Sequence, residues 1–303
     1  MDWGAIPQFL AGGLAIGAVY GLIGVGFSLI YSTSKVINFA QGEFVVYGGL
    51  ATVSLTLFDL PASIALPLAL AASIVMGGAL QGLLSTARKG SNELTYIMTT
   101  IGVAIALQGL AHQIWGTDYR TYALYPQGAI KVLGASVNYA TITILVMTAV
   151  VCMTLWVFLF RTMIGKAMRA CANDSRAAQT VGIRPRRMVL LAYVAGAAIG
   201  GLAGMLITPS QMMSYDNGVI LAIKGFTAAI VGGLANPFGA VIGGLVLGLL
   251  EGLGVGLISS DLQNAYAFIT LLLILLIRPQ GLFGRAEPGS ARLSCVLLLR
   301  LRG

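Results

Sequence analysis

"GKAMRACANDSRAAQTVGIRPRR", residues 165–187, is the one stretch of this chain that has the composition of a water-soluble protein. Its 23 residues carry six basic side chains and one acid, whereas the rest of the sequence largely avoids charge. Runs without a charged residue lie on both sides of it, at 132–160 and 188–215. Because each run can supply the roughly 20 apolar residues that a helical membrane span requires, the stretch is predicted to be a polar loop between two spans.

The same pattern extends over most of the chain, which has 303 residues and is 57% hydrophobic and 9% charged. A typical soluble domain is about 25% charged. Strands of a membrane barrel would place polar residues at every second position, so helices are the predicted spans. The sequence predicts an all-α, polytopic membrane protein with about eight transmembrane helices, some of them broken or re-entrant. Further charge-free runs lie at 3–34, 60–87, 94–117 and 225–250.

Basic residues near the ends of the spans predict the orientation of the chain. Lys35 follows the first span, Arg88 and Lys89 follow the third, and the basic stretch from Arg161 to Arg187 follows the fifth. Alternation places all of these in the cytoplasm and the amino terminus outside. The net charge of +8 is therefore assigned to topology, and no nucleic-acid partner is expected because the chain carries no motif for one.

The last third of the chain contains an interrupted segment, "GGLANPFGAVIGG" at 232–244. Pro237 lacks a backbone donor and biases Asn236 away from helix. Arg278 also belongs inside, so an even number of crossings must follow the charged stretch. Residues 218–257 are predicted to form a broken hairpin, either two short spans or one re-entrant pair, before a last span that ends at Arg278.

The second apolar segment carries polar residues where a span should lie, in "KVINFAQGEFVVYGGL" at 35–50. Asn38, Gln41 and Glu43 are the residues concerned. A charge near mid-membrane costs at least about 2.5 kcal/mol and normally faces a protein interior or a water-filled cavity. Gly42 weakens helix there by about 1 kcal/mol relative to Ala. Either a discontinuous helix faces the substrate path, or Glu43 sits near the cytoplasmic end, eight residues after Lys35.

Glycines recur at a spacing of four in three segments, which keeps them on one face of each helix. Small residues on such a face let two helices approach closely in a membrane. One interpretation is tight packing within the chain, and the other is contact with a second permease subunit. The glycines are Gly13, Gly17 and Gly21; Gly196, Gly200 and Gly204; and Gly244, Gly248, Gly252 and Gly256.

Within the charged stretch, "NDSRAAQTVGI" predicts a short helix with Asp174 as its N-cap and Gly182 just past its end. Ala177, Ala178 and Val181 are expected to share one face, which suits docking into a groove on another protein. Arg169, Arg176 and the arginines at 184–187 are expected to pair with acidic groups or lipid phosphates.

The sequence offers no catalytic or metal-binding constellation. It has no G-x-x-x-x-G-K-[ST] motif, so P-loop binding of ATP is excluded. His112 is the single histidine, and no serine stands in a G-x-S-x-G setting. Cys152, Cys171 and Cys295 lack the paired spacing of a disulfide or zinc site. No cofactor and no metal are expected.

Five motifs taken together resemble the permease subunits of branched-chain amino acid ABC importers, of the LivH type. They occur in the family's order and cover about residues 8–285. They are "VINFAQGEF" (36–44), "GKAMRACANDSRAAQTVGI" (165–183), "GAAIGGLAGML" (196–206), "FTAAIVGGLANPFGAVIGGLVLGLLEGL" (226–253) and "RPQGLFG" (278–284).

The resemblance implies a multi-pass permease of the bacterial inner membrane that is not itself an enzyme. Its expected partners are a second, LivM-like permease, two cytoplasmic ATP-binding subunits and a periplasmic substrate-binding protein. Residues 165–187 match the loop with which the family contacts its ATPases. The coupling residues carried over are Arg169, Asp174, Arg176, Ala177, Ala178, Val181 and Gly182.

Two departures from the family pattern limit what it implies. The family's second segment reads Asn-Phe-Ala-His-Gly-Glu, and Gln41 stands here in place of the histidine. A titrating role at this position therefore loses its support, and urea, amides or aromatic acids stay open beside branched-chain amino acids as substrates. The permease domain is assigned to 1–285, and the atypical tail 286–303 is assigned no function.

A different class of transporter is also compatible with broken helices. An ion-coupled secondary transporter of small polar solutes would place its site at interrupted helices near mid-membrane. It would need embedded coupling groups, and Glu43 and Glu251 are the acids available for that role.

Overall fold

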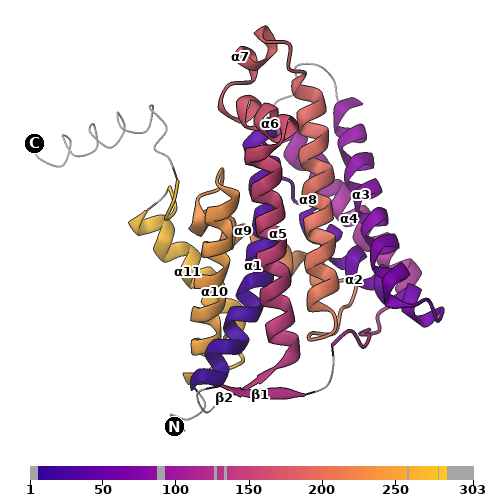
Figure 1. The fold of residues 1–303 in the computed structure, drawn as a ribbon, viewed down its shortest axis with the longest axis vertical. Helices are drawn as coiled ribbons and strands as arrows, with labels where there is room; N and C mark the ends of the chain where they lie inside the picture. The colour runs from indigo at the N-terminus through magenta and orange to yellow at the C-terminus, as the bar shows by residue number, and fades with distance from the viewer. Residues whose placement is uncertain are drawn as a thin grey trace, which may run out of the picture.

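The computed structural model describes residues 6–86, 93–125, 128–132, 135–257, 259–278 and 280–284 (Figure 1). Its helices and strands are α1 (Ile6–Ser34), α2 (Gln41–Leu57), α3 (Ala62–Thr86), α4 (Glu93–Trp115), β1 (Ala129–Val132), β2 (Ala135–Asn138), α5 (Tyr139–Arg161), α6 (Met163–Asn173), α7 (Ser175–Thr180), α8 (Pro185–Ile207), α9 (Asn217–Gly232), α10 (Pro237–Leu257) and α11 (Gln263–Ile277).

Within these ranges six helices, α1, α3, α4, α5, α8 and α10, are long and apolar enough to cross a membrane. Shorter apolar helices, α9 and α11, accompany them. Five of the predicted charge-free runs each correspond to one long helix, and the sixth, 225–250, is divided between α9 and α10. The predicted all-α membrane fold is confirmed. The strands β1 and β2, which pair antiparallel just before α5, were not predicted.

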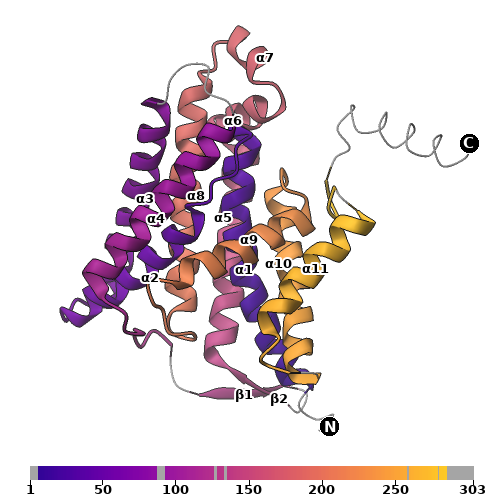
Figure 2. The same cartoon turned by 180° about the vertical axis from the view of Figure 1, so that it is seen from behind.

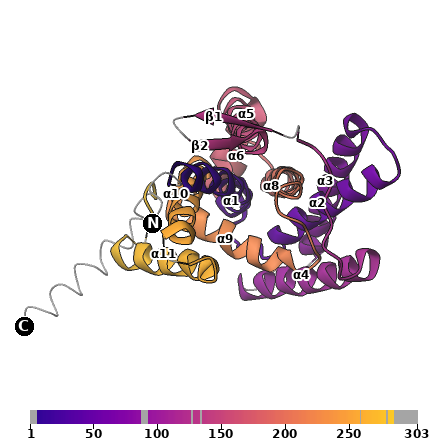
Figure 3. The ribbon, with the colours of Figure 1, turned by 90° about the horizontal axis from the view of Figure 1, so that it is seen from below.

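The helix α1 is the central element of the bundle. In the most apolar 18-residue stretch of α1, 89% is buried inside the protein, whereas only 11% of the corresponding stretch of α4 is buried. It contacts α10, α8, α9 and α5, and Figure 3 shows it between α10 and α8, with α3 and α4 at one side of the molecule. Because α1 is enclosed by protein, its apolar residues pack against other helices rather than against lipid.

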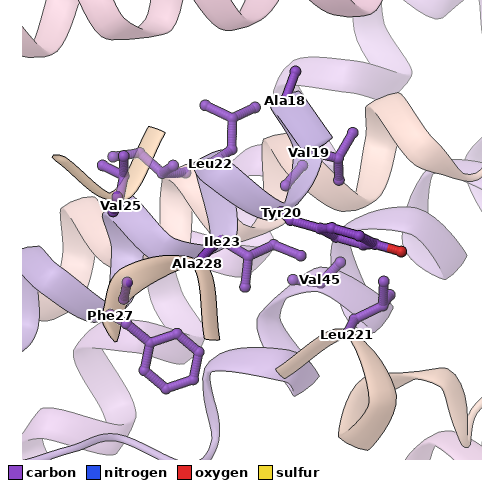
Figure 4. Packing of buried hydrophobic residues seen from close by; sticks show 14 of the residues in the cluster. Ala18, Val19, Tyr20, Leu22, Ile23, Val25, Phe27, Val45, Leu221 and Ala228 are labelled. Carbon is purple, nitrogen blue, oxygen red and sulfur yellow. The ribbon is translucent and has the colours of Figure 1, made fainter. Parts of the chain in front are cut away.

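The buried face of α1 forms the middle of an apolar core with residues from α2 and α9. Figure 4 shows Leu22, Ile23 and Val25 among these side chains. Tyr20 is the polar member of the group, and its hydroxyl is directed away from Leu22 and Val25. A buried tyrosine hydroxyl usually has a hydrogen-bond partner, and its partners here are charged residues described below.

The predicted broken hairpin is confirmed as the antiparallel pair α9 and α10, separated at residues 233–236. Gly233 has a φ of 102°, which favours glycine. Asn236 accepts a hydrogen bond from the Gly239 N–H at 3.2 Å and so caps α10, while Pro237 begins that helix. The 278–284 segment returns to this turn, where the Leu282 N–H donates to the Val231 carbonyl at 2.7 Å.

The predicted cytoplasmic end is assembled from distant parts of the chain. The helices α6 and α7 lie at one end of the molecule, and β1, β2 and the beginning of α1 lie at the other (Figure 1). Lys35, Arg169, Asn236 and Phe283 line one cavity of about 610 Å³ at the end with α6. Three of the places predicted to share a side therefore meet there; Arg88 and Lys89 lie outside the described residues.

The glycine faces of α1 and α10 pack against each other within the chain. A Cβ atom built on Gly17 would lie 2.6 Å from the Gly244 carbonyl oxygen, and one on Gly248 would lie 2.3 Å from the Gly13 oxygen. A Cβ on Gly204 of α8 would similarly strike the Val45 carbonyl of α2. These glycines serve packing inside this subunit, so the alternative that their faces contact a second permease is wrong.

We expect Gly248→Ala to lower the free energy of unfolding by about 2 kcal/mol or more, because overpacking against backbone cannot be relieved by a side-chain rotation. Thermal unfolding of the purified protein in detergent measures this. Gly12→Ala is the matched control, since a Cβ there meets nothing within 4 Å. An unchanged melting temperature for Gly248→Ala would contradict the close helix contact.

Candidate functional site

The polar residues of the second segment lie at the beginning of α2. Residues 35–40 are not helical, and α2 begins at Gln41, with Glu43 in its first turn. The predicted interruption is present, but it precedes Gln41 rather than falling at Gly42. Gly42 is helical and lies against α9, where a Cβ atom would strike the Gly218 carbonyl. Close packing of α2 on α9 therefore explains this glycine.

Gln41 is a packing residue between α2, α1 and α8. It is fully buried, and its Nε2 donates to the Gly196 carbonyl at 3.0 Å. Cβ atoms on Gly26 or Gly200 would collide with this amide nitrogen. The glycines of α1 and α8 thus make room for a long polar side chain that fixes the position of α2.

Glu43 is 2% exposed, so its side chain lies inside the protein and not on its surface. A Cβ on Gly218 would lie 2.6 Å from Glu43 Oε1, so the carboxylate reaches the beginning of α9. Glu43 Oε2, Asn38 Nδ2 and Gln41 Oε1 are buried without a hydrogen-bond partner among the described residues. Unsatisfied polar atoms are costly in a membrane interior. This cluster is suited to meet water or a polar solute.

A second polar cluster, the Lys224 network, lies where α1, α9, α10 and α11 meet. Lys224 Nζ is 2.8 Å from Glu251 Oε1 and donates to the Tyr20 hydroxyl at 3.0 Å. The Tyr20 hydroxyl donates to the same Glu251 oxygen at 3.2 Å, and Gln263 Nε2 donates to it at 2.5 Å. Lys224 is 5% exposed and Glu251 2%, so this is an ion pair inside the bundle.

Sequence reasoning considered Glu251 only as an embedded acid and did not single out Lys224. The signal was present, because Lys224 and Glu251 are the only two charged residues between Asp216 and Asp261, with one on each arm of the predicted hairpin. Two opposite charges on the arms of a hairpin are expected to pair. The pairing ties α9 to α10, and Tyr20 extends it to α1.

The short helix predicted in the charged stretch is present as α7. Asp174 Oδ1 accepts hydrogen bonds from the Ala177 and Arg176 N–H groups, at 3.1 and 2.8 Å. These backbone hydrogen bonds hold the pKa of the Asp174 carboxyl below its usual value, with a smaller contribution from the Arg176 charge. Gly182, with a φ of 84°, follows the helix as predicted. Asp174 and Gly182 therefore define its two ends.

Two details of this stretch differ from the prediction. Ala177, Ala178 and Val181 do not form one exposed face, since Ala178 is 3% exposed and Val181 74%. Ala178 is covered because α7 folds back towards α6 and α8. Arg169 interacts within the chain as well: its Nε donates to the Leu159 carbonyl at 3.0 Å, and its guanidinium lies 4.2 Å from the Phe160 ring centroid.

The amphipathic helix α6 was not predicted. Its N-cap is Thr162, whose hydroxyl oxygen accepts from the Gly165 N–H at 3.0 Å. A Cβ on Gly165 would collide with Leu159, so this glycine permits the sharp turn from α5 into α6. Met168 and Cys171 are buried on its inner face. The loop is therefore a helical unit, α6 and α7 together, that packs against α5 and α8.

The described residues contain no group of three or more His, Cys, Asp or Glu side chains placed to hold a metal ion. What the structure brings together is a buried polar cluster at α2, an ion pair at α9 and α10, and a capped helical projection.

Comparison with known proteins finds matches to transport permeases. The profile of the family described as "Branched-chain amino acid transport system / permease component" matches residues 9–277. The permease protein BraD of Pseudomonas aeruginosa is 32% identical over 297 residues, covering 92% of this chain and 96% of BraD. LivH of Escherichia coli is 30% identical over 299 residues, covering 92% and 96%. LivM of Escherichia coli is 30% identical over 139 residues, covering 43% of this chain and 31% of LivM.

Proposed function

Because this chain belongs to the family of branched-chain amino acid transport system permease components, we propose that it forms part of the path by which an importer carries branched-chain amino acids. The observation that carries this proposal is the family match over residues 9–277, which spans the bundle from α1 to α11. Relatives named for high-affinity transport of these amino acids support the substrate class.

The chain is a multi-pass permease subunit of an ABC transport system in the bacterial inner membrane, and it is not itself an enzyme. This assignment supports the importer and gives no support to the ion-coupled transporter considered as the alternative. Glu251, one of the two acids available to that alternative, is already paired with Lys224.

The proposed assembly contains this subunit, a LivM-like permease, two ATP-binding subunits and a substrate-binding protein outside the membrane. The partial similarity to LivM supports a second permease of related fold. ATP-binding subunits are required because the chain has no P-loop of its own. Residues 1–285 form the permease domain in this proposal, and 286–303 lie outside the described residues.

Residues 165–187, which include most of α6 and all of α7, are proposed to contact an ATP-binding subunit. Their position at one end of the bundle supports this role, as Figure 2 shows from behind. The exposed Val181 and Arg176 are available to a partner, while Arg169, Ala178 and Asp174 fix the helices to the chain and to each other. Because α6 is continuous in space with the end of α5, movement of the ATPase would be transmitted to a membrane helix.

Asn38, Gln41 and Glu43 are proposed to line the substrate path after the helices around them separate. In the present arrangement they are buried between α1, α2, α8 and α9. Their unpartnered polar atoms support a state in which water or substrate reaches them. Alternating access of this kind needs rigid helices that move against each other. The smooth glycine faces, where two helix backbones lie in close contact, are suited to such sliding.

The proposed orientation places α7 in the cytoplasm. A cysteine introduced at the exposed Ser175, in a protein whose native cysteines are replaced by serine, should not react with a membrane-impermeant thiol reagent added to intact cells. It should react after the cells are opened. Labelling from outside would overturn the orientation and the ATPase assignment together.

The proposed function is tested with the complete transporter in proteoliposomes. We expect uptake of L-leucine that depends on ATP and on the binding protein. Competition by urea, amides or L-phenylalanine decides among the substrates that the sequence left open. Absence of ATP-dependent uptake of any of these solutes would refute the proposal.

A further inference from the structure

A small polar cavity of about 220 Å³ lies beside the Lys224 network. It is formed by the end of α8, the connection to α9, the first two turns of α9 and the beginning of α11. Ligand pockets for drug-sized molecules enclose roughly 300 to 1,000 Å³, so this one suits a smaller solute. Its polar lining residues are Tyr20, Gln211, Asn217, Lys224, Gln263 and Asn264.

The cavity lies at the end of the bundle opposite α7. The helix α8 begins next to α7, and its last residue, Ile207, lines the cavity at the other end. In the proposed orientation this is the outer side, where a binding protein would release substrate. The cavity is therefore distinct from the Asn38, Gln41 and Glu43 cluster, which does not line it.

The ion pair presents an incompletely used cation to this cavity. An ammonium group has three donors, and among the described residues the Lys224 ammonium meets two acceptors, Glu251 Oε1 and the Tyr20 hydroxyl. Glu251 Oε1 accepts three hydrogen bonds. The other carboxylate oxygen, Glu251 Oε2, is buried and has no hydrogen-bond partner among the described residues. Of the two charged residues, Lys224 lines the cavity, so its remaining donor is the part of the pair that a solute there could use.

Stability alone is a poor explanation for this arrangement. Replacing a buried ion pair by apolar residues is often neutral or stabilising, and ionisable residues inside membrane bundles usually mark a substrate or ion path. Lys224 lines the cavity with one of its three donors still available, and an anionic group is the ligand that such a cation binds.

We propose that this cavity is an outer binding site for the substrate's carboxylate, with Lys224 as the residue that binds it. This inference rests on the proposed function, because it identifies the amino acid group recognised by the permease. The side-chain amide of Asn264 supplies further hydrogen bonds, and so does the second N–H of the Asn217 amide, which already donates once to the Met212 carbonyl at 3.2 Å. Glu251 positions Lys224. Glu251 also neutralises much of the positive charge of Lys224. The site therefore binds the carboxylate weakly enough to release the substrate into the path.

The test compares the wild type with the double variant Lys224→Met/Glu251→Gln in the complete transporter. Both charges are removed, so neither is left unpaired in the membrane. We expect the variant to assemble and to melt near the wild-type temperature, but to take up L-leucine about tenfold more slowly or worse, since hydrogen bonds to a charged group are worth about 1.5 kcal/mol or more. Lys224→Arg, which keeps the charge, should retain more uptake than the double variant.

Uptake by the double variant within a factor of two of the wild type would show that the ion pair is structural only and would overturn the inference. Failure of the wild-type transporter itself to take up L-leucine would instead count against the proposed substrate. These two failures are distinguishable because the first requires an active wild type.

A second measurement keeps Lys224 intact and does not depend on folding of the double variant. Gln211→Cys, at an exposed position in the lining that is given no part in binding, is placed in the cavity in a protein whose native cysteines are replaced by serine. A thiol reagent added from the outer side should modify it, and binding protein loaded with L-leucine should slow the reaction relative to empty binding protein. Equal rates with loaded and empty binding protein would overturn the inference.

Discussion

Ala178→Pro should leave the protein inserted in the membrane but reduce import by about 100-fold. The Ala178 N–H donates to the Asp174 carbonyl at 3.0 Å, and this hydrogen bond holds the first turn of α7. Proline removes the donor and collides with the preceding turn, at a cost of about 3 kcal/mol, which corresponds to about 100-fold in an equilibrium. Because Ala178 is also buried beneath the loop, the change separates α7 from α6 and α8.

The measurements are uptake of L-leucine and retention of the ATP-binding subunits during purification, and both should fall together. Ser175→Pro is the matched control. Ser175 is the first residue of α7, where proline is well tolerated, and Asp174 before it already has the extended φ and ψ of −151° and 107° that proline favours. Normal import by Ala178→Pro, or equal loss in both proline variants, would refute coupling through this helix.

The features that sequence reasoning predicted well are those set by local rules. Asp174 and Gly182 identify the ends of α7 because an N-cap and a left-handed glycine act within a few residues of their own position. Asn236 and Pro237 locate the break between α9 and α10 for the same reason. The long spans follow from the length of their apolar runs.

The features it missed depend on which helices become neighbours. Spacing placed Gly13 and Gly248 on helix faces, but only the fold shows that these faces meet each other within one chain. Lys224 and Glu251 become a pair only when α9 and α10 lie antiparallel. The expected face of Ala177, Ala178 and Val181 is wrong because the rest of the loop covers Ala178, which no local pattern indicates.

Glu43→Ala should impair import far more than Glu43→Gln, by about tenfold or more, with binding of the ATPases unchanged in both. Glutamine preserves the size of the side chain and its capacity to hydrogen-bond, whereas alanine removes both. When the path is open and a polar solute lies against Glu43, removing this group leaves the solute's polar atom without a partner, which costs roughly 1 to 3 kcal/mol, or about tenfold to a hundredfold. The measurement is the uptake of L-leucine by each variant, normalised to the amount of assembled transporter.

Equal loss in the two Glu43 variants would assign the effect to the charge and contradict a hydrogen-bonding role.

A further variant separates hydrogen bonding from the filling of space. Gly218 faces the Glu43 carboxylate, and a Cβ there lies 2.6 Å from Glu43 Oε1. In Glu43→Ala/Gly218→Ala, the added methyl group occupies part of the volume that the carboxylate leaves. If Glu43 only fills that volume, the double variant should recover import. If it supplies a polar group to the path, as we expect from its unpartnered Oε2 atom, the double variant should import no better than Glu43→Ala, because a methyl group restores contact but no hydrogen bond.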